Sequence, residues 1–102
     1  MDDSVFNAMT SFQFFCNDLF KQKNIDKLMP KNMKRSDWNN RKESILNEEV
    51  ESVNRYLDQQ ALLRLQNYTA SANKEDIEKR FNDIITRVMD NYKAKVKGYY
   101  QW

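Results

Sequence analysis

The sequence predicts an all-α protein, a small three-helix bundle in one domain spanning residues 1–102, on three observations. One glycine and one proline occur in 102 residues, so little in the chain interrupts a helix. Apolar residues recur at spacings of three and four through three long segments, which is the period of an amphipathic helix. A chain of this length normally forms one domain, and its 40% hydrophobic content supplies one modest core.

The first helix is predicted at about residues 4–21 from a stripe of apolar residues. The members of this stripe, which define the expected core face, are Val5, Phe6, Met9, Phe12, Phe15, Cys16, Leu19 and Phe20. Phe14 falls outside the stripe, so this helix carries more aromatic surface than one contact face requires. We therefore expect the helix to be covered on two sides or to meet a partner.

A basic connector is predicted at about residues 22–35. Its lysines are mixed with scattered apolar residues, and Pro30 biases Met29 away from helical geometry, so one short helical turn is all that we expect. Ser36 is the predicted N-cap of the following helix, since a serine oxygen accepts a hydrogen bond from a backbone amide of the first turn.

The second helix is predicted at about residues 37–68, a segment without internal glycine or proline. Its core face comprises Ile45, Leu46, Val50, Val53, Leu57, Ala61, Leu65 and Tyr68. The average spacing from Leu46 onward, about 3.7 residues, exceeds the roughly 3.5 of a left-handed coiled coil and favours a globular bundle. Leu62 and Leu63 lie off this face, so they are either wrapped by neighbouring helices or form an extra apolar patch.

The third helix is predicted at about residues 74–97, after a short turn at residues 69–73 that makes the last two helices an antiparallel hairpin. Asn73 is its predicted N-cap, and Gly98 is its predicted C-cap in the left-handed conformation. Its core face comprises Ile77, Phe81, Ile84, Ile85, Val88, Met89, Tyr92 and Val96. We expect the first helix to pack across this hairpin.

The residue types that most catalytic and metal sites require are scarce. No histidine occurs, and a single glycine cannot build a phosphate-binding loop. The lone Cys16 excludes an intramolecular disulfide and lies on an apolar stripe, so a buried structural thiol is expected, with a covalent dimer as the alternative. We predict that the chain is not an enzyme and that it holds no cofactor or metal.

A basic patch is predicted because residues 21–42 carry eight Lys and Arg against two Asp. Lysines on a phosphate backbone release counterions, and an aromatic ring can stack on an unpaired base. The acidic stretch from Glu43 onward opposes that interpretation. The alternatives are a solvated connector, a nucleic-acid site and a contact for an acidic protein. The candidate residues are Lys27, Lys31, Lys34, Arg35, Trp38, Arg41 and Lys42.

An aromatic tail is predicted at residues 98–102, where three rings occur in five residues. Aromatic residues bury a large area and keep a polar edge, so they are favoured at interfaces. The tail is expected to fold back over the open end of the bundle, to anchor a partner or a second copy, or to sit at a membrane interface.

The leading functional expectation is a non-catalytic protein–protein interaction module, of the adaptor, inhibitor, immunity or chaperone type, that acts by surface binding. Its rivals are a small nucleic-acid-binding protein that uses the basic patch and a structural homo-oligomer, including a homodimer. The candidate partner-binding residues, which are aromatic or apolar and lie outside the core faces, are Phe14, Leu62, Leu63, Tyr99, Tyr100 and Trp102.

No segment reaches the roughly 18 consecutive apolar residues that a membrane span needs. Asp2 and Asp3 stand where a signal peptide carries basic residues. We therefore expect a small soluble protein of the cytoplasm, with a removed signal peptide as the alternative.

Overall fold

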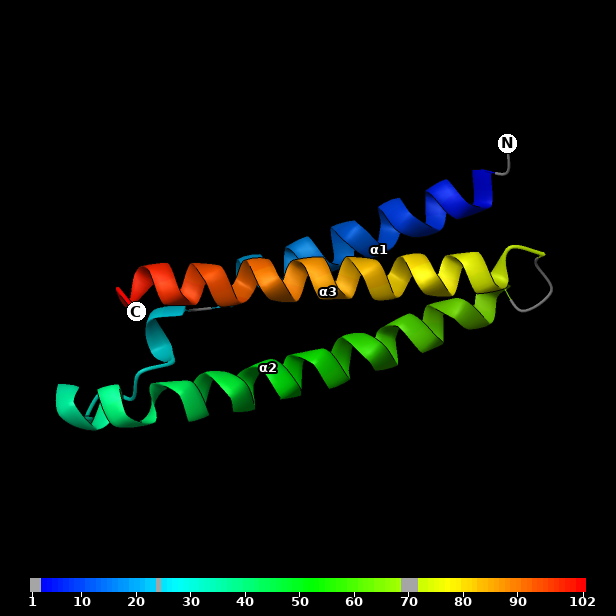
Figure 1. Cartoon of the computed structure of the whole chain (residues 1–102). Coiled ribbons are helices and arrows are strands. Elements are labelled where there is room, and N and C mark those ends of the chain that lie inside the picture. Colours follow the sequence, from blue (N-terminus) through cyan, green and yellow to red (C-terminus); the bar gives the residue numbers. More distant parts are fainter. Residues whose placement is uncertain (1–2, 24, 69–71) are drawn as a thin grey trace.

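The computed structural model describes residues 3–23, 25–68 and 72–102, and it confirms the predicted three-helix bundle (Figure 1). The described residues form three α-helices, α1 (Asp3–Gln22), α2 (Arg35–Leu65) and α3 (Lys74–Tyr99). Two short 3-10 helices follow α1 and α2, namely η1 (Ile25–Lys27) and η2 (Gln66–Tyr68). The short helical turn predicted within the connector is therefore present as η1, whereas the predicted turn at 69–73 lies mostly outside the described residues.

The bundle is a rod with extents of 54 × 18 × 17 Å. Figure 1 shows α3 between the other two helices, with α2 antiparallel to it and α1 running in the same direction as α3. The rod therefore has two different ends. The hairpin end comprises residues 3–14, 57–68 and 72–84, and the connector end comprises residues 21–23, 25–46 and 91–102.

The core follows the predicted stripe of α3 completely, because this helix packs against both neighbours. All eight predicted core residues of α3 are buried. Phe12 of α1 is fully buried at the centre, with its ring centroid 4.6 Å from that of Phe81. From α2 the core receives Leu46, Val53, Leu57, Ala61 and Leu65. The amphipathic period therefore locates the core correctly on α3. On α2 five of the eight predicted residues are buried, Val50 and Tyr68 pack partly buried against the core, and Ile45 is half-buried outside it.

On α1 the predicted core face is wrong at one position. Phe6 is 66% exposed, whereas Ala8, which the predicted stripe omits, is buried. The buried residues Ala8, Phe12 and Cys16 follow one another at a spacing of four, so they form one narrow row against α3 and α2. Phe6 stands two residues before Ala8, about 200° around the helix at 100° per residue, and so points away from the core.

The predicted N-cap of the second helix is wrong as well. The N-cap residue is Lys34, and the helix begins at Arg35, so Ser36 lies inside the first turn. The backbone amide of Trp38 donates to the carbonyl of Lys34 over 2.9 Å, which closes that first turn. Asp37 lies in the first turn, where its charge meets the positive end of the helix dipole.

The predicted C-cap of the third helix is also wrong. Gly98 has helical geometry, and the left-handed residue is Gln101, whose φ is 54°. The Trp102 amide donates to the Lys97 carbonyl over 2.8 Å and the Gln101 amide to the Gly98 carbonyl over 3.3 Å, which is the paired closure of a Schellman motif. Because the helix continues through Gly98, it places Tyr100 on the same face as Val96, where Tyr100 reaches the connector.

Candidate binding surfaces at the two ends of the bundle

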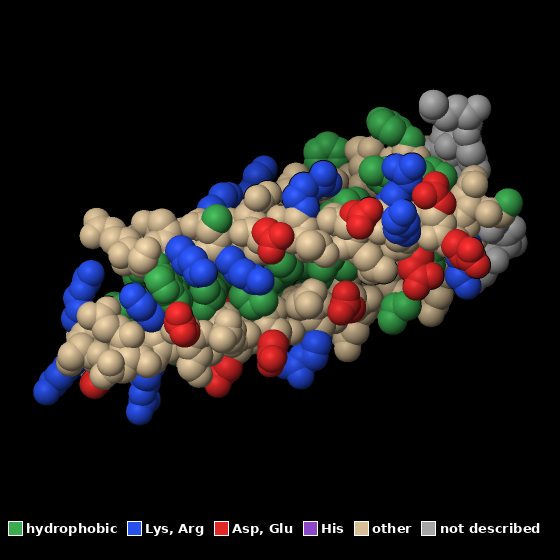
Figure 2. Space-filling view, viewed as in Figure 1, with side chains coloured by type: hydrophobic (Ala, Val, Ile, Leu, Met, Phe, Trp, Pro, Cys, Tyr) green, Lys and Arg blue, Asp and Glu red, His purple; other side chains and the backbone are tan. Residues whose placement is uncertain are grey.

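Basic side chains from separate parts of the chain meet at the connector end. Residues 21–46 and 91–102 together carry eleven Lys and Arg against three Asp and Glu, whereas the rest of the chain carries six against twelve. The net charge is therefore +8 on these 38 residues and −6 on the other 64. Figure 2 shows basic side chains crowded at this end of the rod. Tertiary structure adds Lys93, Lys95 and Lys97 of α3 to the predicted patch.

Tyr100 holds the segments of the connector end together. Its hydroxyl donates to the carbonyl of Ile25 over 2.5 Å and accepts a hydrogen bond from the amide of Met29 over 3.2 Å. Its ring centroid lies 4.6 Å from that of Trp38, which is 2% exposed. The end of α3 is thus tied to the connector and to the start of α2, so the basic residues of all three segments have defined relative positions.

Trp102 brings two lysines close to one another. The Nζ of Lys42 lies 4.9 Å from the centroid of the Trp102 ring, and the Nζ of Lys97 lies 5.7 Å from it, both within the range of cation–π attraction. A shallow groove of about 310 Å³ runs beside this ring between α2 and α3. Its lining residues are Glu43, Leu46, Asn47, Lys93, Lys97 and Trp102.

The predicted basic patch is exposed in most of its members, with one correction. Lys27, Lys31, Lys34, Arg35 and Arg41 are exposed, and Lys42 is half-buried beside Trp102. The alternative in which Trp38 stacks on an unpaired base is wrong, because its side chain is 2% exposed and packs against Tyr100. The lysines of α3 were missed as members of the patch, since more than 50 residues separate them from it in the sequence.

The hairpin end exposes large apolar side chains instead. Among the described residues of this end, Phe6 and Phe14 of α1 are 66% and 64% exposed, and Leu62 and Leu63 of α2 are 60% and 56% exposed. Phe6, Thr10 and Phe14 follow one another at a spacing of four, so they form a row along one side of α1. These side chains therefore remain in contact with water in the described structure, where a partner could cover them.

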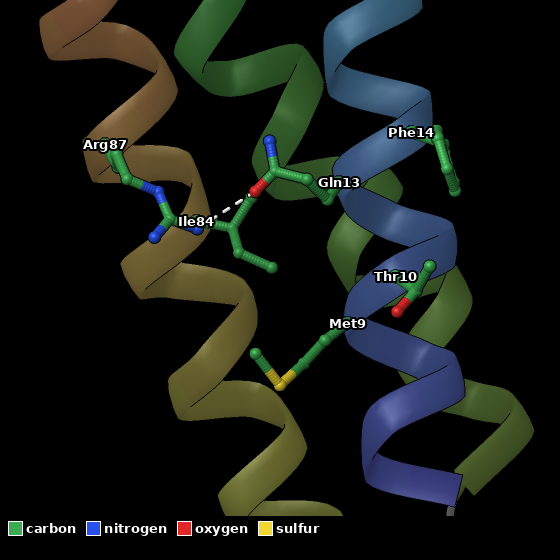
Figure 3. A pocket seen from close by; sticks show the side chains of 6 residues that line it. All are labelled: Met9, Thr10, Gln13, Phe14, Ile84 and Arg87. Atoms are coloured by element: carbon green, nitrogen blue, oxygen red, sulfur yellow. Dashed lines mark hydrogen bonds between the residues drawn. The ribbon is translucent and has the colours of Figure 1, made fainter. Parts of the chain in front are cut away.

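A groove of about 220 Å³ runs between α1 and α3 beside this row (Figure 3). Met9, Gln13 and Ile84 line its floor, and Figure 3 shows Phe14 pointing away from α3, on the outer side of α1. Arg87 donates to the Gln13 side-chain oxygen over 2.9 Å. One guanidinium nitrogen of Arg80 lies 3.4 Å from the sulfur of Met9, so two arginines flank this groove.

A second groove, of about 260 Å³, separates α2 from the start of α3. It is lined by Asp58, Ala61, Leu62, Leu65, Glu78, Phe81 and Asn82. Leu62 forms part of its rim, beside the carboxylates of Asp58 and Glu78. The two grooves of the hairpin end are therefore both apolar at the base, but one carries basic residues and the other carries acidic residues.

The six predicted partner-binding residues do not form one surface. Phe14, Leu62 and Leu63 belong to α1 and to the hairpin end of α2, whereas the aromatic tail lies at the opposite end of the rod (Figure 1). Within the tail, Tyr99 is 58% exposed, and Tyr100 and Trp102 are half-buried. Two of the three rings of the tail thus contribute to packing over the end of the bundle.

Cys16 lies in the core and is fully buried. Burial raises the pKa of its thiol to about 11, an increase that the nearby Arg64 charge partly offsets. The thiol therefore stays protonated at neutral pH, where it is a poor nucleophile. Burial, together with the charges of Glu49 and Tyr100, likewise raises the pKa of Tyr92 to about 12.

Within the described ranges, no three His, Cys, Asp or Glu side chains come close enough together to hold a metal ion. None of the helices in the described part of the chain is long and apolar enough to span a membrane.

Comparison with protein-family models, with curated proteins and with solved structures returns no match. The fold and its surfaces therefore define the class of the protein: a small all-α three-helix bundle with one basic end and one apolar end.

Proposed function

We propose that this protein is a non-catalytic interaction module that binds a protein partner through the apolar surface of its hairpin end. The observation that carries the proposal is the exposure of four large apolar side chains there, in a molecule that otherwise buries a regular core. Such a protein would act by occluding or scaffolding its partner, as adaptors, inhibitors and chaperones do.

Covering these side chains would contribute favourable free energy to binding. Complete burial of one leucine or phenylalanine side chain contributes about 1.5–3 kcal/mol. A few well-packed anchors of this kind supply most of the affinity in known interfaces. Phe6 and Phe14 form one row and Leu62 with Leu63 the other, so a partner could use either row as its anchor site.

Charge would orient the partner on this end. Arg87 and Arg80 flank the groove beside α1, with Arg80 paired to Asp76 over 3.2 Å, whereas Asp58 and Glu78 flank the groove beside α2. Charges at the rim of an interface mainly set association rate and orientation rather than affinity. A partner with an apolar ridge and acidic neighbours therefore fits the α1 groove, and one with basic neighbours fits the α2 groove.

The proposal is tested with a double variant, Phe14→Ser with Leu62→Ser, against Tyr99→Ser as the control at the opposite end. All three side chains are more than half exposed, so we expect unchanged helicity and a change in stability below about 0.5 kcal/mol. Affinity capture from a lysate of the producing organism should recover a specific protein with the wild type and with Tyr99→Ser. The double variant should recover at least about tenfold less.

If all three proteins recover equal amounts of the partner, the hairpin end is not the binding surface. Light scattering on the same samples separates the homo-oligomer from a different partner. If the wild type is a dimer and the double variant a monomer, the occupant of this face is a second copy of the chain. A monomeric wild type leaves the face to another protein.

A further inference from the structure

We propose that the connector end binds single-stranded nucleic acid, with lysines from three segments on the phosphates and the Tyr99 ring on a base. This site is at the other end of the rod from the proposed protein-binding surface, so each proposal can fail without the other. It differs from the surface expected from sequence, because Lys93, Lys95, Lys97 and Tyr99 join it and Trp38 leaves it.

Most of the positive charge at this end is not neutralised within the molecule. Two of its eleven basic residues form ion pairs with other described residues, Lys23 with Glu49 over 2.9 Å and Lys93 with Asp90 over 4.0 Å. The other nine have no ion pair in the described part of the chain. Clustered ammonium groups of this kind favour a polyanion, because binding releases the counterions condensed on its phosphates.

The Trp102 ring brings two ammonium groups of this end close to one another. It lies within 6 Å of the ammonium groups of Lys42 and Lys97, and the groove at its side also receives Lys93. Attraction to the ring offsets part of the repulsion between the two lysines, so it helps to hold both near Trp102. Two cations from different helices are thereby presented together, one from the start of α2 and one from the end of α3.

Tyr99 supplies the exposed aromatic surface. It is 58% exposed and stands one helical turn after Lys95. Tyr99 lies about 200° around α3 from Lys97, so a bound strand passes over the end of α3 to reach both residues. Its ring packs edge-on against Tyr100 with centroids 4.8 Å apart, and Tyr100 is itself anchored to the connector. The ring is therefore held against an anchored neighbour while more than half of its side chain is exposed, as a stacking platform for an unpaired base requires.

The composition of the surface favours a single strand over other polyanions. Among the described residues of this end, Tyr99 is the one large apolar side chain that is exposed. A single ring does not form an apolar patch that an acidic protein could bury. A duplex could use the lysines, but its paired and stacked bases would leave the Tyr99 ring without a partner. A single strand uses both the charge and the ring.

The test measures binding of a fluorescently labelled single-stranded oligothymidylate of about 20 nucleotides by polarisation over a series of salt concentrations. The logarithm of the association constant should fall linearly with the logarithm of salt concentration, with a slope of about −0.7 for each phosphate neutralised. Lys42→Glu with Lys97→Glu should make the slope shallower by about 1.4, as expected for two lost contacts.

Two further variants keep this result interpretable. Lys27→Glu with Lys31→Glu changes exposed residues of the connector and should weaken binding in the same way even if the first pair disturbs Trp102. Arg55→Glu with Lys79→Glu applies the same charge change to exposed residues outside the connector end and should have the smaller effect. An equal loss in this control would show that net charge alone is responsible, and would overturn the proposed site.

Tyr99→Ala should weaken single-strand binding roughly tenfold or more and leave binding of a duplex of equal length nearly unchanged. Tyr56→Ala, at a partly exposed tyrosine in the middle of α2, is its control. The proposal is overturned if low salt reveals no binding, if polyglutamate competes as well as the oligonucleotide does, or if Tyr99→Ala affects single strand and duplex equally.

Discussion

The two ends of the rod have similar numbers of aromatic and aliphatic residues, but they differ in how many of these side chains are covered. At the connector end, Trp38 and Tyr100 pack on each other and Trp102 lies along a groove, so lysines dominate the surface. At the hairpin end, Phe6, Phe14 and two leucines remain exposed.

The difference follows from the number of segments that meet at each end. At the connector end, residues 25–33 pack beside the helices as a fourth segment, and their backbone forms the hydrogen bonds of the Tyr100 hydroxyl. At the hairpin end the described residues of the three helices and η2 leave Phe6, Phe14, Leu62 and Leu63 more than half exposed. Exposure of a ring thus depends on whether another segment covers it, and this follows from topology more than from hydrophobicity.

The largest expected effect separates buried from exposed rings at the hairpin end. Phe12→Ala should lower the free energy of unfolding by about 3–5 kcal/mol, because Phe12 is fully buried against Phe81. Phe14→Ala, two residues away and exposed, should change it by less than about 0.5 kcal/mol. Chemical denaturation followed by circular dichroism measures both, and similar losses in the two variants would contradict the described packing of α1.

The next effect compares two adjacent rings of the tail. Tyr100→Ala should destabilise the protein by about 2–4 kcal/mol, since it removes the contact with Trp38 and leaves the Met29 amide and the Ile25 carbonyl without their partner. Tyr99→Ala should cost less than about 1 kcal/mol, because Tyr99 is 58% exposed. The same denaturation measurement applies, and an unaffected Tyr100→Ala variant would mean that the tail does not close the connector end.

Alkaline pH should loosen the folded state by a smaller amount. Burial raises the pKa of Cys16 from its ordinary 9.0 to about 11, and that of Tyr92 from 10.0 to about 12. The folded protein therefore retains protons that the unfolded chain releases, so this stability is complete below pH 9 and is lost as pH rises through 11 to 12. For Cys16 the loss is on the order of 2 kcal/mol.

Unfolding titrations at pH 8 and pH 10.5 measure that loss. Cys16→Ala should reduce the pH dependence, and Tyr92→Phe should remove the contribution from the connector end. The two variants therefore show how much of the alkaline loss comes from the middle of α1 and how much from the side near the connector. A stability that is independent of pH over this interval would argue against burial of both groups.

The smallest effect concerns the last turn of α3. Gly98→Ala should stabilise the protein by about 0.5–1 kcal/mol, because Gly98 is helical and an added Cβ meets no atom within 4 Å. Gln101→Gly should stabilise it by a similar amount, since Gln101 has the left-handed φ of 54°. Thermal melting measures both. A destabilised Gly98→Ala variant would instead favour the helix end that the sequence predicts.

Local patterns were sufficient for the helices and for most of the core. The eight predicted core residues of α3 are all buried because this central helix is covered on both sides, so its apolar period maps directly onto contacts. The same rule failed for Phe6, since α1 is covered along a narrower strip and a periodic phenylalanine near its edge stays in water. Periodicity predicts which side of a helix is apolar, but it does not predict how much of that side the neighbouring helices bury.

The sequence by itself determined the three amphipathic helices, the basic character of residues 21–42 and the scarcity of catalytic residue types, because each depends on neighbours in the chain. Tertiary structure decided which aromatic residues are covered and which lysines share a surface. Tyr100 covers Trp38 from 62 positions away, and Lys97 meets Lys42 at Trp102 from 55 positions away. Such contacts depend on how the helices pack, and no local spacing in a single sequence encodes that arrangement.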